Sequence, residues 1–284
     1  MKKRVSITVD DRLLREVDEI VDGAAVKSRS HAMEILLRRA LNQEQVTQAL
    51  ILAGGKGTRL RPLTYELPKP LFPLAGKPIM EHLLNGLKNA GIKDILVSVG
   101  HKAEKVISYF GDGSKFGVKI TYITEPEPMG TGGPLTLAAN MLDKTFLMLN
   151  GDVVTNIDFL DLMAFHRRTN ALGTIALFQV EDASRFGAVE LVGNKIARFI
   201  EKPEKDQSQS KLINAGIYVL NRDILKHIPE GFCLIEDVFS QLAPRGLLSG
   251  YVHGGEKAYW TDIGTERSYA AVLREVKTGK VGWL

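Results

Sequence analysis

The 284-residue chain has a single cysteine, Cys233, so it can form neither an internal disulfide nor a zinc site built from several cysteines. It has no run of 18 apolar residues, so we expect no membrane-spanning segment, and its first residues lack the apolar stretch of a secretory signal. Neither sign of charge dominates: 37 Lys and Arg against 33 Asp and Glu give a net charge of +4. That balance suits anionic ligands without indicating a nucleic-acid-binding protein. These absences predict a soluble, cytoplasmic protein.

Proline and glycine are scarce in the first 45 residues, which hold no proline and only one glycine, Gly23, although the chain has 11 prolines and 27 glycines. A short polar stretch at 42–45 follows. The hydrophobic content of 44% is that of a globular chain, and the length suits one large domain or two modest ones. We therefore predict a small module over residues 1–45 and a large domain over residues 48–284.

The small module begins with apolar and polar residues in alternation, which is the period of a strand with one buried face. The apolar positions are Val5, Ile7 and Val9, and the polar ones are Arg4, Ser6 and Thr8. Two helical patterns follow, the first capped by Asp10 or Asp11 and the second by Ser28 or Ser30. One strand and two helices of this size cannot bury their own apolar faces, so we expect the module to pair with a second copy.

This order of one strand and two helices, over residues 3–42, resembles the ribbon-helix-helix fold of small bacterial and archaeal repressors. In that family two strands form an antiparallel ribbon in the DNA major groove. The resemblance implies that Arg4, Ser6 and Thr8 would touch bases and that the backbone around 28–30 would meet a phosphate. The alternative is a module that only dimerises. Its nine Lys and Arg against eight Asp and Glu favour the alternative, because DNA binding draws on excess positive charge.

The large domain opens on an apolar run at 49–53, followed by the glycine-rich turn Gly54-Gly55-Lys56-Gly57-Thr58-Arg59. The spacing fits neither the P-loop nor the dinucleotide-binding fingerprint. Glycines after a strand nevertheless let backbone N–H groups approach phosphates, while lysine and arginine neutralise the charge. The turn therefore predicts phosphate binding.

Further polar motifs lie downstream of this turn. They are Pro68-Lys69-Pro70, Asn150-Gly151-Asp152, Glu201-Lys202-Pro203, Asn214-Ala215-Gly216 and Trp260-Thr261-Asp262. Together with the turn, and in this order, they closely resemble the sugar-phosphate nucleotidylyltransferases over residues 49 to about 275. The resemblance implies an α/β fold with a Rossmann-like mixed sheet. The sequence agrees, because strand-like runs alternate with helical patterns. These runs lie at 49–53, 94–99, 145–149 and 173–180.

The resemblance also implies a role for each motif. In that family a sugar 1-phosphate attacks the α-phosphorus of a nucleoside triphosphate and expels pyrophosphate, so the protein must align two anions. The residues implied to bind the nucleotide are Leu52, Ala53, Gly54, Gly55, Gly57, Thr58, Glu125, Gly130 and Asp152. Those implied to bind the sugar phosphate are Gly187, Glu201, Lys202, Asn214 and Gly216. Arg59 and Lys69 match the catalytic cations, and Asp152 and Asp262 match the pair that holds Mg²⁺.

The choice of base depends on residues 125–133, which correspond to the family's base-reading loop. Glu125 stands where thymidylyl- and many uridylyltransferases tend to have glutamine. A carboxylate only accepts hydrogen bonds, and guanine offers two adjacent donors, whereas uracil and thymine offer one donor between two carbonyl oxygens. The stretch at 130–135 also looks like that of mannose 1-phosphate guanylyltransferases, and heptose 1-phosphate guanylyltransferases share several motifs. We therefore expect GTP with mannose or heptose 1-phosphate. The alternative within the class is glucose 1-phosphate with UTP or dTTP.

A second alternative belongs to another class, a DNA-binding regulator whose large domain only senses nucleotide sugars. The presence of Lys69, Asp152 and Asp262 argues against it, because a sensor does not need the full catalytic set. Turnover distinguishes the two.

Overall fold

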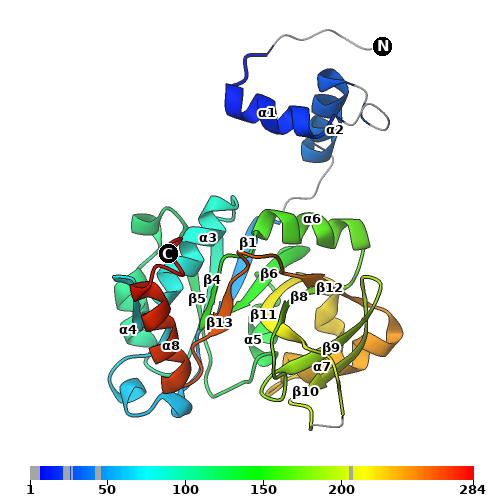
Figure 1. The fold of residues 1–284 in the computed structure, drawn as a ribbon. Helices are drawn as coiled ribbons and strands as arrows, with labels where there is room; N and C mark the ends of the chain where they lie inside the picture. The colour runs from blue at the N-terminus through cyan, green and yellow to red at the C-terminus, as the bar shows by residue number, and fades with distance from the viewer. Residues whose placement is uncertain (1–6, 22–25, 27, 42–45, 205–206) are drawn as a thin grey trace. The chain divides into compact units, whose positions relative to one another are not determined.

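The computed structural model describes the chain apart from residues 1–6, 22–25, 27, 42–45 and 205–206 (Figure 1). The chain divides into two compact units, Met1–Gln45 and Val46–Leu284. Within the described ranges, no helix is both long enough and apolar enough to cross a membrane.

The small unit contains helices α1 (Asp11–Glu19) and α2 (Arg29–Leu41). The Asp10 carboxylate accepts two hydrogen bonds from N–H groups in the first turn of α1. The Ser28 hydroxyl accepts one from the first turn of α2. Each helix therefore begins at one of the caps that the sequence predicts, because these side chains satisfy donors that have no partner inside the helix.

The predicted N-terminal strand is only partly within the described residues. Arg4 and Ser6 lie outside them, and Thr8 is exposed in a stretch at 7–10 that has no regular secondary structure. Ile7, predicted to face a core, is 61% exposed in this single chain. A ribbon strand has no ladder partner within one copy, so both its pairing and the cover for Ile7 would have to come from a second copy.

The large unit is built on a mixed sheet of nine strands among the described residues. In spatial order they are β5 (Lys119–Thr124), β4 (Asp94–Val99), β1 (Gln48–Leu52), β6 (Thr145–Asn150), β11 (Leu212–Asn221), β8 (Gly173–Gln179), β12 (Leu248–Val252), β10 (Lys195–Glu201) and β9 (Gly187–Val192). The strands from β5 to β6 are parallel, whereas β11 runs antiparallel to both β6 and β8. The four predicted strand-like runs are β1, β4, β6 and β8.

Both faces of the sheet are buried, because successive side chains of a strand point to opposite sides and helices cover each side. In β1, Ala49 and Ile51 belong to one apolar core and Leu50 belongs to the other. The first core includes α3 (Ile79–Asn89), α4 (Ala103–Phe110) and α6 (Phe159–Thr169), and the second includes α5 (Gly133–Leu137) and α7 (Ile235–Leu242). The layers α, β and α confirm the predicted fold class (Figure 1).

A short ribbon of β7 (Val153–Thr155) and β13 (Trp260–Asp262) pairs antiparallel apart from the main sheet. A third apolar core packs it against α8 (Glu266–Lys277). A second small hairpin joins β2 (Pro73–Leu74) to β3 (Lys77–Pro78). Short 3-10 helices occupy Thr58–Leu60, Leu63–Tyr65, Lys69–Leu71, Ser114–Phe116, Arg222–His227 and Ala243–Arg245. The β7–β13 ribbon positions the site, because Asp152 directly precedes it and Asp262 ends it.

Candidate active site

Two adjoining cavities lie where β1 and β6 end, the position at which open α/β sheets bind ligands. The first cavity, of about 390 Å³, includes the glycine-rich turn and Glu125. The second cavity, of about 250 Å³, includes Asp262 and Glu201. Five residues line both cavities, namely Arg59, Thr131, Asn150, Asp152 and Leu234. Ligands in the two cavities would therefore meet at this shared wall.

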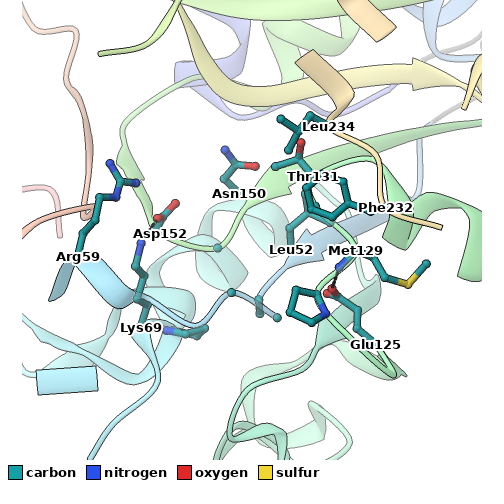
Figure 2. Close-up of a pocket in the computed structure, with 17 residues that line it drawn as sticks. Leu52, Arg59, Lys69, Glu125, Met129, Thr131, Asn150, Asp152, Phe232 and Leu234 are labelled. Atoms are coloured by element: carbon teal, nitrogen blue, oxygen red, sulfur yellow. Dashed lines mark hydrogen bonds and ion pairs between the residues drawn. The ribbon is translucent and has the colours of Figure 1, made fainter. Parts of the chain in front are cut away.

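The first cavity has two chemically different ends. Figure 2 shows Arg59, Lys69 and Asp152 on one side of it and Glu125 and Met129 on the other. Cations at one end suit phosphates. A carboxylate beside a buried apolar side chain at the other end suits a base that carries hydrogen-bond donors. The two ends of the cavity therefore match the two ends of a nucleoside triphosphate, its phosphates and its base.

The glycine-rich turn keeps its backbone open to the first cavity. Gly54 and Gly55 line the cavity, and a Cβ at Gly54 would collide with the Glu125 carboxylate. Gly57 has a φ of 61°, which favours glycine. The cavity also takes in Leu52, Ala53 and Gly130 from the predicted set. Gly57 and Thr58 line neither cavity, so their contact with a nucleotide stays a prediction.

Lys69 and Asp152 form an ion pair, with 2.8 Å between Lys69 Nζ and Asp152 Oδ2. Their side chains are only 14% and 24% exposed, so solvent screens the pair weakly. The lysine enters from the 3-10 helix that follows Pro68, and the aspartate from the end of β6. The bond holds the ammonium group beside Asp152, which is part of the wall that the two cavities share.

Asp262 is brought to Asp152 by the β7–β13 ribbon, although the two are far apart in sequence. Asp262 pairs with Val153, the residue after Asp152, and the Ile263 N–H donates a 2.9 Å hydrogen bond to the Asp152 carbonyl oxygen. Burial raises the pKa of Asp262, and the nearby Asp152 charge raises it further. The positive charges of Arg185, Lys69 and Arg59 act in the opposite direction.

These two carboxylates suit a divalent cation that is shared with a ligand. Within the described part of the chain, no group of three or more His, Cys, Asp or Glu could hold a metal ion unaided. Mg²⁺ commonly takes one or two protein carboxylates and completes its shell with water and substrate phosphates. Asp152 and Asp262 lie near the cationic end of the first cavity, which suits phosphates, so they fit that mode of binding.

The second cavity brings together every residue that the sequence assigns to the sugar phosphate. Gly187, Glu201, Lys202, Asn214 and Gly216 all line it. Lys202 Nζ lies 3.0 Å from Glu201 Oε1, and the lysine has a φ of 46°, a conformation that costs a residue with a side chain about 1–2 kcal/mol. The neighbouring structure must hold this strained backbone in place, and the ammonium group is paired with Glu201, which also lines the cavity.

A break in the β11–β8 ladder shapes the floor of the second cavity. The Asn214 side chain donates to the Tyr218 hydroxyl and accepts from the Gly216 N–H, both at 2.9 Å. Gly216 has a φ of 68°, and a Cβ there would lie 2.6 Å from the Asn150 amide nitrogen. Asn214 therefore already holds the bulge, and its predicted contact with a sugar hydroxyl stays a prediction.

Asn150 carries a signal that sequence reasoning did not use. Its Oδ1 atom is buried and, among the described residues, has no hydrogen-bond partner, while the residue lines both cavities. Buried polar atoms are rarely left unpaired. A donor on a bound ligand, such as a sugar or ribose hydroxyl, would satisfy it. The residue opens the Asn150-Gly151-Asp152 motif, which marked it in the sequence.

Three further cavity residues escaped prediction. Phe232 lines the base end of the first cavity with 66% of its surface exposed, so a bound base would cover apolar area there. Arg185 and Glu236 line the second cavity. Arg185 lies two residues before Gly187, so the motif around Gly187 could have pointed to it. No sequence motif marks Phe232 or Glu236, because they belong to a separate segment that precedes and begins α7.

The mixed α/β sheet therefore carries two adjoining cavities that share one wall, an arrangement that suits two phosphate-bearing ligands. Residues 48–279 match the family model described as nucleotidyl transferase, and the chain belongs to that family. Residues 3–44 match the model of ribbon-helix-helix proteins of the copG family.

Individual relatives narrow the comparison. The chain is 38% identical to a mannose-1-phosphate guanylyltransferase of Mycobacterium tuberculosis over 227 residues, which cover 78% of this chain and 62% of that protein. A Bacillus anthracis protein named as a glucose-1-phosphate thymidylyltransferase, crystallised with a sucrose, has a TM-score of 0.73 and 27% identity over 80% of this chain and 94% of its own. HddC from Yersinia pseudotuberculosis, complexed with GMP-PN, has a TM-score of 0.67 and 27% identity over 81% of this chain and 100% of its own.

Proposed function

We propose that the chain transfers a guanylyl group from GTP to mannose 1-phosphate, or to a closely related heptose 1-phosphate, with release of pyrophosphate. The observation that carries this proposal is the shared wall of the two cavities, because Arg59 and Asp152 line both of them. The 38% identical guanylyltransferase supports the choice of substrates. The complex of HddC with GMP-PN supports a guanine nucleotide.

The reaction is an in-line displacement between two anions. A phosphate oxygen of the sugar 1-phosphate forms a bond to the α-phosphorus, and the bond from that phosphorus to the oxygen that bridges it to the β-phosphate breaks. The electron pair leaves with pyrophosphate, and no protein nucleophile or proton transfer is required. Arg59 and Lys69 neutralise the approaching charges, and the transferred group is stabilised by cations fixed in place beforehand.

A divalent cation held by Asp152 and Asp262, which we propose to be Mg²⁺, would neutralise phosphate oxygens of both substrates. The rest of the alignment comes from the chain itself. The backbone at Gly54 and Gly55 receives the triphosphate, and Lys202 receives the sugar phosphate. The ion pair from Lys69 to Asp152 keeps the lysine beside the attacked phosphate.

Pyrophosphate release tests the proposal. We expect the full chain, supplied with Mg²⁺, to turn over GTP with mannose 1-phosphate faster than UTP, dTTP, ATP or CTP with mannose or glucose 1-phosphate. The physical reason is the carboxylate at the base end of the first cavity. A preference for UTP or dTTP with glucose 1-phosphate would transfer the proposal to the alternative substrates. Absence of turnover with every pair would favour the regulator that senses nucleotide sugars.

The small unit, we further propose, joins two chains into a dimer. Deletion of residues 1–47 is expected to lower the molar mass measured by sedimentation from that of an oligomer toward that of one chain. The exposed Ile7 and Leu13, which need cover from a second copy, give the reason. The deletion removes no cavity residue, because the first of them is Leu52. An unchanged number of chains per particle, now of shortened chains, would place the oligomer contact in the large unit.

DNA is a possible second partner of the small unit, favoured only by the ribbon-helix-helix match. Fluorescence anisotropy with genomic fragments at low salt measures it directly. If the ribbon reads bases, binding falls steeply with salt, and Arg4→Ala combined with Thr8→Ala abolishes it while the dimer persists. We expect flat anisotropy at micromolar protein, because the module's charge is nearly balanced.

A further inference from the structure

Two segments far apart in sequence are joined backbone to backbone beside the cavities. One is the loop at 125–132, and the other precedes and begins α7. The Gly132 N–H donates to the Cys233 carbonyl oxygen at 2.8 Å, and the Cys233 N–H donates to the Met129 carbonyl oxygen at 3.0 Å. A Cβ at Gly130 would collide with that same Cys233 carbonyl oxygen. The loop therefore cannot move without moving the start of α7.

One side-chain contact extends this junction into the second cavity. The Thr131 hydroxyl accepts a 2.9 Å hydrogen bond from the Ile235 N–H and donates one of 2.5 Å to Glu236 Oε2. With a donor on one side and a carboxylate on the other, the hydroxyl has a single orientation. Glu236 is only 9% exposed, and burial raises its pKa despite the hydrogen bond from Thr131. The bond lies largely outside water, where such contacts are strongest.

The two partners belong to different cavities. Thr131 lines both, whereas Glu236 lines only the second, beside Glu201 and Lys202. Within the described residues, no other side chain donates a hydrogen bond to the Glu236 carboxylate, since Ser240 donates only to the Glu236 backbone carbonyl oxygen. The Glu236 backbone N–H also hydrogen-bonds to this carboxyl group, and a carboxylate has about four acceptor positions, so lone pairs remain for a hydroxyl group in the second cavity. The Thr131 hydroxyl is the connection between a loop that faces the base and a carboxyl group that faces the sugar.

We propose that the bond between Thr131 and Glu236 couples the two cavities, so that a nucleotide in the first raises the affinity of the second for the sugar phosphate. This proposal rests on the proposed function for the identity of the two ligands. A base held at Glu125 restricts the loop, and the loop fixes the Glu236 carboxyl group before the sugar arrives. A sugar that meets a group already ordered loses less entropy on binding. Coupling of this kind is reciprocal, so the sugar phosphate raises nucleotide affinity by the same factor.

Calorimetric titration of the full chain measures the coupling. Mannose 1-phosphate is titrated into the protein with Mg²⁺, first alone and then with a saturating GTP analogue that has a methylene group between its α- and β-phosphates, so that no transfer occurs. We expect the nucleotide to strengthen sugar-phosphate binding by about 5-fold or more, the usual lower bound for coupled sites. Thr131→Val should bring this ratio to about one, because it removes the hydroxyl that joins the two cavities. Thr131→Ser, which keeps the hydroxyl, should restore it.

A matched control and a double variant separate coupling from stability. The Thr136 hydroxyl donates to the Gly133 carbonyl oxygen on the same segment but lines neither cavity, so Thr136→Val should keep the wild-type ratio. Glu236→Ala should lose the ratio, and adding Thr131→Val to it should cost nothing more, because both changes break one connection. A merely structural Thr131 would instead lower the melting temperature and both affinities while leaving their ratio unchanged.

A Thr131→Val protein that retains the wild-type ratio overturns the proposal, and so does a wild-type ratio of one. Both outcomes are distinct from failure of the proposed function, which pyrophosphate release reports separately. Normal guanylyl transfer with a ratio of one would leave the function intact and remove the coupling. A ratio that depends on the Thr131 hydroxyl, without turnover, would support the coupling and contradict the enzymatic function.

Discussion

Replacement of Asp152 or of Asp262 by asparagine is expected to lower kcat for guanylyl transfer by roughly 10²-fold or more, the scale for loss of one preorganised electrostatic group. Asparagine has the same shape but lacks the charge that holds a divalent cation. The fold should persist, because the β7–β13 ribbon pairs through backbone groups. Initial rates of pyrophosphate release at saturating substrates measure the effect. Chelator should abolish wild-type activity, and added Mg²⁺ should restore it.

The two variants should differ in their response to metal and to the lysine. Asp152→Asn also removes the charge partner of Lys69, so its loss should persist at high Mg²⁺. Asp262→Asn leaves that ion pair in place, so added Mg²⁺ should recover part of its activity. Asp237→Asn, an exposed aspartate on α7, is the matched control and should behave as wild type. Full activity in either site variant would remove that residue from the mechanism.

These two aspartates also show how much of the site can be predicted from the sequence. Each stands in a motif after or within a strand, so its chemistry could be predicted. Their proximity could not, because it depends on the pairing of Asp262 with Val153 in a ribbon formed by distant segments. The apolar runs predicted four of the nine strands described in the sheet, namely β1, β4, β6 and β8, because side chains on both faces of these strands are buried. The predicted N-terminal strand is different in kind, because a ladder for it would need a second copy.

The sequence failed to predict Phe232 and Glu236 as cavity residues for the same physical reason. Phe232 and Glu236 flank the start of α7, a segment with no motif, and they reach the cavities because its backbone bonds to the loop at 129–132. Asn214 shows the reverse case. The family resemblance implies a sugar contact for it, which stays a prediction, while its amide already bonds to Tyr218 and Gly216. A sequence pattern marks residue types at a site, whereas packing decides which of their atoms are available.

The proposed base-reading role of Glu125 is supported by its neighbours. The Ser98 hydroxyl donates to Glu125 Oε1 at 2.7 Å, and the Met129 N–H donates to Oε2 at 3.3 Å. Two donors from the protein hold the carboxylate in one orientation at the end of the first cavity. Each carboxylate oxygen can accept a second hydrogen bond. The free acceptor sites match the two adjacent donors of guanine, so the group can bind the base without giving up its own supports.

Glu125→Gln is therefore expected to lower kcat/KM for GTP by roughly 10- to 100-fold, the cost of leaving buried polar groups unpaired. The new amide group would place donors where guanine and Met129 also donate. UTP and dTTP, each with a carbonyl oxygen on either side of its one donor, should lose little or gain, so the ratio of GTP to UTP turnover should fall. Glu127→Gln, an exposed neighbour that lines neither cavity, is the matched control and should leave the ratio unchanged. Equal losses for GTP and UTP would show that Glu125 supports the loop rather than reading the base. A wild-type protein that prefers UTP or dTTP would exclude the guanine reading altogether, whatever the variant does.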